Sequence, residues 1–421
     1  MFSSLQQVRA RLVPIISGQA LGLLCGIIGV RLTSSLVAPA DYGRYGVFLS
    51  FTTLGMWVVH AGLIKYVSRH WAAAPAKAHL LRAILRQWQR KLPWLTLGAI
   101  GASVAIGRLT SLSPWIMLAP LFLVISLLSL AALAQAALQA AREHWRDFSV
   151  SATGSVSRTF APLLLFLALG SAAGLYLGFC LHAVLTLIAG SVMMRRHLKP
   201  SATAAGSQPV VDQIYTGPLF TFLSLAGWVL AGTNRWITAS FFGDVQAGYF
   251  MLASNMVIIV PSLIGTSVLQ LFQPDLFRMG DHDTADSLRP LARRVDQVAA
   301  GFCGTSLLGV LALHAVMPWL VGPLVHKTYL AALIWIIPVG CFGVATMTGA
   351  LLSNHADGCT EGTGLRTRGY HYRQHIHRRQ HAGCAWRADR LHALAHAHAR
   401  DSLVGHAPPR PPVLFQTGLS P

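Results

Sequence analysis

Apolar runs of about the length of a membrane span, separated by short polar loops, follow one another along the chain up to residue 354. A helix that crosses the hydrocarbon core of a bilayer needs about 20 predominantly apolar residues. Ten runs approach or reach this length, and each predicts a transmembrane helix. They cover residues 12–34, 45–67, 92–107, 114–138, 156–171, 174–194, 217–241, 247–272, 297–322 and 328–353. The pattern therefore predicts an all-α polytopic membrane protein.

The charged residues between these runs predict the orientation of the chain in the membrane. Basic residues concentrate in alternate loops: Arg9 and Arg11; Lys65, Arg69, Lys77, Arg82, Arg86, Arg90 and Lys91; Arg142 and Arg146; Arg195, Arg196 and Lys199; and Arg278, Arg289, Arg293 and Arg294. The opposite loops hold only Arg31, Arg44, Arg108 and Lys327. Because cytoplasmic loops carry the excess of Lys and Arg, we expect a cytoplasmic N-terminus. The first run is too long for the apolar region of a secretory signal, so we expect it to remain as an anchor.

A polar segment, "RRHLKPSATAAGSQPVVDQ" (195–213), separates the first six predicted helices from the other four. We therefore expect a six-helix N-terminal lobe (1–195), a cytoplasmic linker (196–213) and an incomplete C-terminal lobe (214–354). The remaining residues, 355–421, differ from all of these in composition.

Two similar segments lie on either side of the linker, "RLTSSLVAPADYGRYGVFLS" (31–50) and "RWITASFFGDVQAGYFMLAS" (235–254). Each starts from an Arg at a helix end, passes an acidic residue, Asp41 or Asp244, and reaches a Gly and a Tyr that open the next helix. Many transporters are built from parallel repeats, with the substrate path between the two halves. The similarity predicts two lobes of transmembrane helices around a central cavity.

The composition fits this architecture and excludes several classes of function. Of the 421 residues, 53% are hydrophobic and 11% are charged, whereas soluble domains have roughly 25% charged residues. The net charge of +19 is carried by short loops, as in bilayer proteins, so it does not indicate nucleic acid as a partner. The six cysteines form no C-x-x-C pair, which argues against a disulfide framework and a zinc site. No phosphate-cradling Gly-rich loop and no nucleophile elbow is present, so we expect neither an enzyme nor a cofactor.

Charged and polar residues inside or beside the predicted spans are the candidates for a substrate path. Arg158 falls near the start of the fifth span, and Arg235, with Asn234 beside it, falls late in the seventh. A charge at mid-bilayer costs about 2.5–3.5 kcal/mol on insertion scales, so such residues usually face a polar cavity. The alternative for Arg158 is that its side chain reaches the nearer interface. Arg31 and Lys65, at helix ends, are further candidates, with loop anchoring as the alternative.

Other polar and small residues in the spans have simpler explanations. Gly18, Gly22 and Gly26 lie four apart on one face of the first helix, a spacing that allows close helix packing in lipid. His60, His182 and His314 each lie alone within a predicted span, where a histidine can relay protons or pack as a hydrogen-bonded side chain. The ten acids before residue 355 lie in loops or at helix ends, so we expect no intramembrane carboxylate for ion coupling.

Two stretches carry a resemblance to a known family. One is "VAPADYGRYGVFLSFTTLGMWVVHAGLIKYVSRHW" (37–71), a hydrophobic-Pro-acidic-Tyr-Gly turn that enters an apolar helix ending in Gly-Leu and a basic residue. The other is "GPLFTFLSLAGWVLAGTNRWITASFFGDVQAGYFMLASNMV" (217–257), in which Pro begins the helix and Asn-Arg lies late in it. The first resembles the first-loop and second-helix signature of polysaccharide (O-antigen-type) flippases of the multidrug/oligosaccharidyl-lipid/polysaccharide exporter superfamily. The second resembles the entry to their second half.

The resemblance implies two six-helix lobes flanking a cavity that opens alternately to each face. It implies a cargo of oligosaccharide on a polyprenyl diphosphate, moved across the bacterial inner membrane for lipopolysaccharide or other surface polysaccharide, with other assembly proteins as possible partners. Arg can hold such an anionic headgroup through paired hydrogen bonds. By motif position, Arg235 and then Arg31 match the family's cationic cavity. The chain departs from the family after residue 354, where two more helices are expected.

The segment 355–421 holds nine of the 18 histidines and nine arginines but no Lys. Spacings such as that of His371, His375 and His377, or of His392, His396 and His398, would suit Zn²⁺ or Ni²⁺, and the Arg, His and aromatic content would suit nucleic acid. Neither explains the abrupt change after "GALLSN" (349–354). As translated, we expect the segment to be disordered, with no metal bound.

A frameshift near His355 explains the change better. His codons are CAY and Ala codons GCN, so His-Ala repeats advanced by one base encode Met-Leu repeats. The same advance lets "HADGCTEGTG" (355–364) encode Met-Leu-Met-Ala-Val-Gln-Lys-Ala-Gln-Gly, a helix end and basic loop. DNA sequence across codons 345–365 tests this hypothesis. Three alternatives to a flippase remain open: a drug or metabolite exporter, a membrane polysaccharide polymerase or ligase, and a non-functional remnant.

Overall fold

The described part of the chain consists of helices joined by short turns. The computed structural model describes residues 2–72, 74, 77–110, 114–198, 218–258, 261–262, 264–265 and 285–349. No β-strand occurs among these residues. The expected all-α class is therefore confirmed for the described residues. The expected linker beyond residue 198 and the His-rich segment lie outside them.

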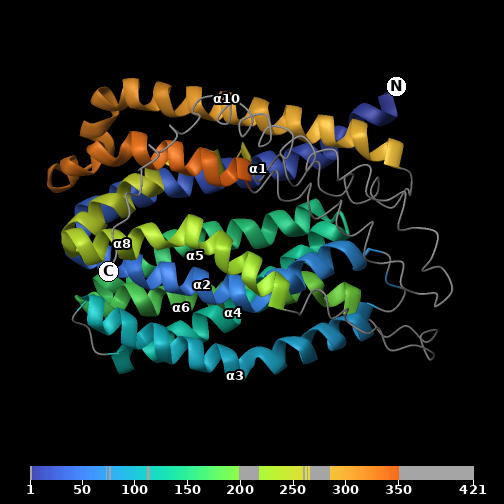
Figure 1. Cartoon of the computed structure of the whole chain (residues 1–421), viewed down its shortest axis with the longest axis horizontal. Helices are drawn as coiled ribbons and strands as arrows, with labels where there is room; N and C mark the ends of the chain where they lie inside the picture. The colour runs from blue at the N-terminus through green and yellow to red at the C-terminus, as the bar shows by residue number, and fades with distance from the viewer. Residues whose placement is uncertain are drawn as a thin grey trace, which may run out of the picture.

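The helices run roughly parallel in one elongated bundle (Figure 1). Their bounds are α1 (Phe2–Leu36), α2 (Pro39–His70), α3 (Lys77–Thr110), α4 (Pro114–Ala140), α5 (His144–Leu169), α6 (Ala173–Met194), the 3-10 helix η1 (Arg195–Leu198), α8 (Pro218–Val257), α10 (Ala285–Leu324) and the 3-10 helix η2 (Lys327–Trp335). Residues 336–349 continue η2 as an α-helix.

Six of the described helices are long and apolar enough to cross a membrane, and a seventh if the bent pair Pro39–His60 and Gly62–Ser68 is one span. α3 and α8 form helices where spans are expected but are not among them. In α3, Lys91 and Arg108 flank an apolar run of residues 92–107 that is shorter than a full span. In α8, Asn234 and Arg235 interrupt the apolar run.

Breaks between helices occur where the backbone chemistry requires them. Pro39 occupies the first turn of α2, where its missing N–H costs nothing. Gly170 ends α5 with a φ of 60°, a left-handed cap that glycine adopts without strain. Gly243 has φ 83° and ψ 169° inside α8, which divides that element into two helices joined at a kink. The two spans expected over residues 217–272 therefore begin as the two arms of α8.

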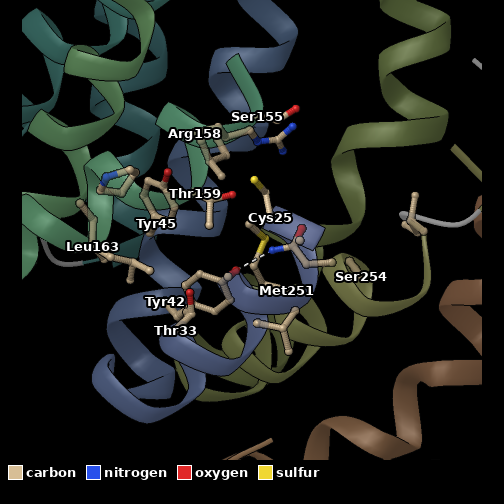
Figure 2. A pocket seen from close by; sticks show the side chains of 18 of the residues that line it. Cys25, Thr33, Tyr42, Tyr45, Ser155, Arg158, Thr159, Leu163, Met251 and Ser254 are labelled. Atoms are coloured by element: carbon tan, nitrogen blue, oxygen red, sulfur yellow. Dashed lines mark hydrogen bonds between the residues drawn. The ribbon is translucent and has the colours of Figure 1, made fainter. Parts of the chain in front are cut away.

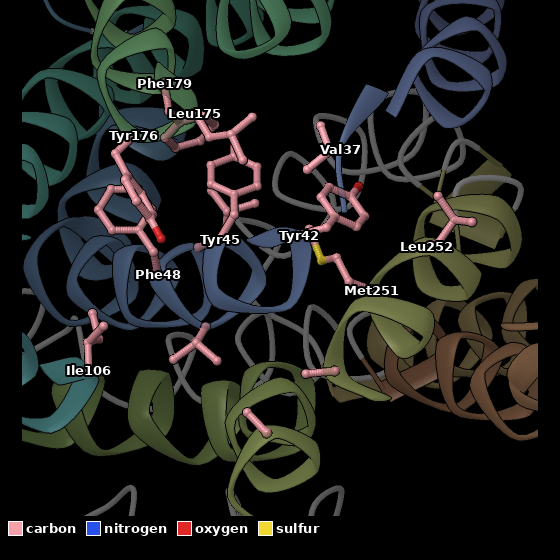
Figure 3. Packing of buried hydrophobic residues seen from close by; sticks show 14 of the residues in the cluster. Val37, Tyr42, Tyr45, Phe48, Ile106, Leu175, Tyr176, Phe179, Met251 and Leu252 are labelled. Carbon is pink, nitrogen blue, oxygen red and sulfur yellow. The ribbon is translucent and has the colours of Figure 1, made fainter. Parts of the chain in front are cut away.

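Within the described elements, α2 is the centre of the packing. Its most extensive contact is with α8, and it also packs on α4, while α5 packs on α6 and on α1. Figure 3 shows an aromatic group at the core, in which Tyr45 and Phe48 of α2 face Tyr176 and Phe179 of α6. The rings of Phe48 and Tyr176 meet edge to face with centroids 5.1 Å apart. Such pairs add specific geometry to apolar burial.

Large apolar side chains cover the outside of the bundle. Trp94, Trp115 and Trp319 are 74%, 78% and 74% exposed, and Ile334 and Leu164 are exposed as well. A soluble monomer rarely exposes apolar surface on this scale, whereas a lipid-facing surface requires it. Together with the spans, this surface identifies a multi-pass membrane protein.

Candidate substrate cavity

A cavity of about 360 Å³ lies between α1, α2, α5 and α8, along the C-terminal half of α1 and the middle of α5. Its walls combine apolar side chains with hydroxyl, amide and guanidinium groups. The polar residues that line it are Thr33, Tyr42, Tyr45, Ser155, Arg158, Thr159, Arg235, Ser254, Asn255 and Ser262. No Asp or Glu is among the lining residues.

Arg158 and Arg235 bring two positive charges to this cavity from different helices. Figure 2 shows Arg158 projecting from α5 into the space between α5 and α8. Arg158 is exposed and Arg235 is half-buried, and their charges act on one another across the cavity. Among the described residues, neither guanidinium has an ion pair or a side-chain hydrogen bond to the protein. Two unneutralised guanidinium groups facing one cavity have the chemistry to hold an anion.

Tyr42 and Asn255 add neutral hydrogen-bonding groups beside the arginines. The Asn255 Nδ2 donates to the Tyr42 hydroxyl at 2.5 Å (dashed in Figure 2). Tyr42 stands at the start of α2 and Asn255 in the second arm of α8, so this hydrogen bond joins the two halves of the chain at the cavity wall. A polar ligand in the cavity would compete for both groups.

The structure places the five residues expected on the substrate path in different environments. Arg158 and Arg235 line the same cavity. Asn234 is half-buried beside Arg235 but is not a lining residue. Arg31 is exposed on α1 and lies outside the cavity lining, as does the half-buried Lys65 on α2. The similarity of the segments that begin at Arg31 and Arg235 therefore does not produce a matched pair of cavity arginines. The second arginine that lines the cavity is Arg158.

The glycines expected to serve helix packing divide between two roles. A Cβ on Gly18 would lie 3.4 Å from the Phe148 side chain, so Gly18 packs against α5. Gly22 and Gly26 line the cavity. Because they have no side chains, they leave the α1 wall open to a ligand.

Two of the three histidines in spans are buried and hydrogen-bonded. The His60 Nδ1 lies 3.1 Å from the Ser129 Oγ. The His182 Nδ1 lies 2.8 Å from the Ser157 Oγ and 3.2 Å from the Thr186 Oγ1. His314 is exposed on α10. His60 and His182 thus fit the packing alternative, since local hydroxyl groups satisfy their rings.

One end of the cavity is closed by the two similar segments 31–50 and 235–254, which we call the echo segments. They pack directly on each other. A Cβ on Gly43 would lie 2.0 Å from the Asp244 carbonyl oxygen, and a Cβ on Gly248 would lie 1.9 Å from the Pro39 carbonyl oxygen. The contact is reciprocal, because each segment's glycine meets the other segment's helix break. Such reciprocity is the geometry expected of a two-fold-like repeat.

An ion pair and a buried tyrosine reinforce this closed end. The Arg44 Nε donates to the Asp244 Oδ2 at 2.8 Å, and the Arg44 Nη1 lies 3.5 Å from the Asp41 Oδ1. The fully buried Tyr329 of η2 donates from its hydroxyl to the Val37 carbonyl at 3.0 Å. The second half of the chain thus holds the α1–α2 turn at several points.

A buried carboxylate at the other end of the bundle is a feature that the sequence pattern did not reveal. Asp147, in the first turn of α5, is 6% exposed. The Gln139 Nε2 on α4 donates to its two carboxylate oxygens at 3.2 and 3.3 Å. Gln135, one turn earlier, donates to the Ser151 Oγ at 2.8 Å. Gln135 and Gln139 are four residues apart on α4, and so are Asp147 and Ser151 on α5. This matching spacing was the signal in the sequence for a polar contact between the two helices.

Comparisons with protein-family models, with curated proteins and with solved structures each find no match to this chain.

Proposed function

We propose that this protein is a flippase, which moves a polyprenyl-diphosphate-linked oligosaccharide across the bacterial inner membrane by alternating access. The cargo would supply the synthesis of an O-antigen-type surface polysaccharide. The observation that carries the proposal is the pair of unneutralised arginines, Arg158 and Arg235, which face one intramembrane cavity without an acid among its lining residues.

The chemistry of the cavity suits a diphosphate headgroup. Arg binds phosphate oxygens through paired, charge-assisted hydrogen bonds, and these gain strength where water is scarce. Tyr42 and Asn255, with the hydroxyl groups around them, offer further partners to phosphate or sugar oxygens. An exporter of cationic drugs would instead require an acid or an aromatic cage at this position.

The size of the cavity favours the headgroup rather than the whole cargo. Its volume of about 360 Å³ is near the lower end of ligand pockets, which span roughly 300–1,000 Å³. Such a volume accommodates a diphosphate and the first sugar, while the polyprenyl chain stays in the lipid. The exposed apolar faces of α1 and α5 beside the cavity suit that chain.

The orientation follows from the basic loops. With the N-terminus in the cytoplasm, the α1–α2 turn and the Gly243 kink lie on the periplasmic side. The closed end described above is then the periplasmic end, and this conformation faces the cytoplasm, from which the cargo is loaded.

The test is a flipping assay with the full-length protein in liposomes. A polyprenyl-diphosphate oligosaccharide with a fluorophore on the sugar is reconstituted, and a membrane-impermeant reductant is added outside. We expect the protein to expose the inner-leaflet pool to the reductant, and to leave a phosphate-free polyprenyl glycoside of the same sugar protected. Equal exposure of both lipids, or of neither, would contradict the proposal, and transport of a cationic dye by the same liposomes would favour an exporter.

A further inference from the structure

We propose that Arg44 and Asp244 form a latch that holds the cavity closed at the end where the α1–α2 turn lies, and that this latch must open to release the cargo. The inference rests on the proposed alternating access but concerns residues outside the cavity lining. It assigns a gating role to an ion pair between the two halves of the chain.

The latch joins two elements that are far apart along the chain. Arg44 lies in the first turns of α2 and Asp244 directly after the Gly243 kink of α8, 200 residues further along the chain. Both residues follow a helix break, so each can move with the arm that carries it. An ion pair at this position connects the two halves where they meet.

The ion pair is partly shielded from water, but the Asp244 carboxylate lacks part of its hydrogen bonding. The Arg44 and Asp244 side chains are 30% and 17% exposed, so water screens the pair less than it would on an open surface. Arg44 reaches only one of the two Asp244 carboxylate oxygens, and the Asp244 Oδ1 is buried with no hydrogen-bond partner among the described residues. A buried acceptor without a partner raises the free energy of the closed state and makes opening easier.

The latch lies next to the cavity. Tyr42, two residues before Arg44, lines the cavity together with Arg235 and receives the hydrogen bond of Asn255. The Tyr42 ring also meets the Tyr329 ring edge to face, with centroids 6.5 Å apart. A headgroup that displaces Asn255 from Tyr42 would disturb the α2–α8 contact beside the latch. Ligand binding and opening are therefore linked through neighbouring side chains.

The test uses Cys25, which lines the cavity and is 4% exposed, as an accessibility probe. The five other cysteines are replaced by Ser in the full-length chain. The rate of Cys25 modification by a charged, membrane-impermeant methanethiosulfonate is then measured from each side of the membrane, in spheroplasts and in inverted vesicles. Asp244→Asn, Arg44→Gln and the exchanged pair Arg44→Asp with Asp244→Arg are compared with the parent.

We expect Asp244→Asn and Arg44→Gln to raise the rate about tenfold from the side of the α1–α2 turn and to lower it from the opposite side. The exchanged pair should restore part of the parent's protection. Arg146→Gln is the matched control, since Arg146 of α5 pairs with Glu143 just before that helix, and it should leave both rates unchanged. A rate that stays at the parent's value in both single variants would overturn the latch, and so would an equal rise from both sides, which marks general loosening. Because modification of Cys25 needs no lipid cargo, this result is independent of the flipping assay.

Discussion

Gly43 of α2 and Gly248 of α8 lie so close that a Cβ on Gly43 would fall 2.8 Å from the Gly248 nitrogen. The absence of side chains at these two positions allows the echo segments to meet backbone to backbone. The ion pair of Arg44 with Asp244 and the hydrogen bond of Tyr42 with Asn255 both depend on that approach. The contact that closes this end of the cavity therefore depends on Gly43 and Gly248.

Replacing either glycine should loosen this contact. Gly43→Ala or Gly248→Ala forces the helices apart, and overpacking of this kind costs about 1–3 kcal/mol. We expect a lower midpoint of thermal unfolding for the protein in detergent. Gly98→Ala is the control, because a Cβ on Gly98 in α3 would meet nothing within 4 Å, and its midpoint should be unchanged or higher. Equal midpoints for all three variants would show that α2 and α8 are not in close contact.

Asp147 should stabilise the α4–α5 contact through Gln139. Asp147→Ala leaves the half-buried Gln139 amide without its charged acceptor, and a hydrogen bond to a charged group contributes about 1.5–3 kcal/mol. Asp147→Asn keeps one carbonyl oxygen as an acceptor and should cost less. Thermal unfolding checks the order parent, Asn variant, Ala variant. The neutral control is Ser149→Ala, whose hydroxyl makes only a solvent-exposed hydrogen bond to the Trp145 carbonyl of the same helix. An Ala variant as stable as the parent would mean that the hydrogen bond contributes nothing.

An anion in the cavity should shield Cys25. Inorganic pyrophosphate, drawn to Arg158 and Arg235, would occupy the space that Cys25 lines. We expect pyrophosphate to slow the modification of Cys25 by a methanethiosulfonate in the detergent-solubilised parent, and chloride at equal ionic strength to have no such effect. In Arg235→Ala the protection should be lost. Protection that persists in this variant would place the anion elsewhere.

His182 should be dispensable for transport. Its ring is held by the hydroxyl groups of Ser157 and Thr186, and a Gln side chain can accept or donate one of these hydrogen bonds. We expect His182→Gln to keep the flipping rate within about twofold of the parent, a change of roughly 0.4 kcal/mol. A loss of tenfold or more (~1.4 kcal/mol) in a stably folded variant would instead indicate a proton relay.

The sequence predicts the helices well because the length of an apolar run is a local property of the chain. The break before Pro39 and the division near Gly243 could both be anticipated from the echo segments. The pattern of hydrophobic and polar positions could not predict which arginines line the same cavity. Arg31 and Arg235 occupy equivalent places in the echo, yet only Arg235 lines the cavity, together with Arg158 from a helix without an echo. That pairing depends on how α5 packs between α1 and α6, a tertiary relationship with no periodic signal.

Asp147 shows a second limit of the sequence. Its place in the first turn of a helix suggests an exposed acid, and its burial follows only from the approach of α4 with Gln139. The contact of Gly43 with Gly248 is of the same kind, since a glycine in a turn motif suggests backbone freedom and not a partner some two hundred residues away.

The cavity arginines are proposed to bind the anionic headgroup of the cargo, so the flipping rate should depend on Arg235. Initial flipping rates of the labelled polyprenyl-diphosphate oligosaccharide are measured in liposomes for the parent, Arg235→Ala, Arg235→Lys and Arg31→Ala. Loss of a charge-assisted contact, about 1.5–3 kcal/mol, predicts a rate at least about tenfold lower for Arg235→Ala, a partial rate for Arg235→Lys because the charge stays, and an unchanged rate for Arg31→Ala. A parent-like rate for Arg235→Ala, or an equal loss in Arg31→Ala, would contradict the claim.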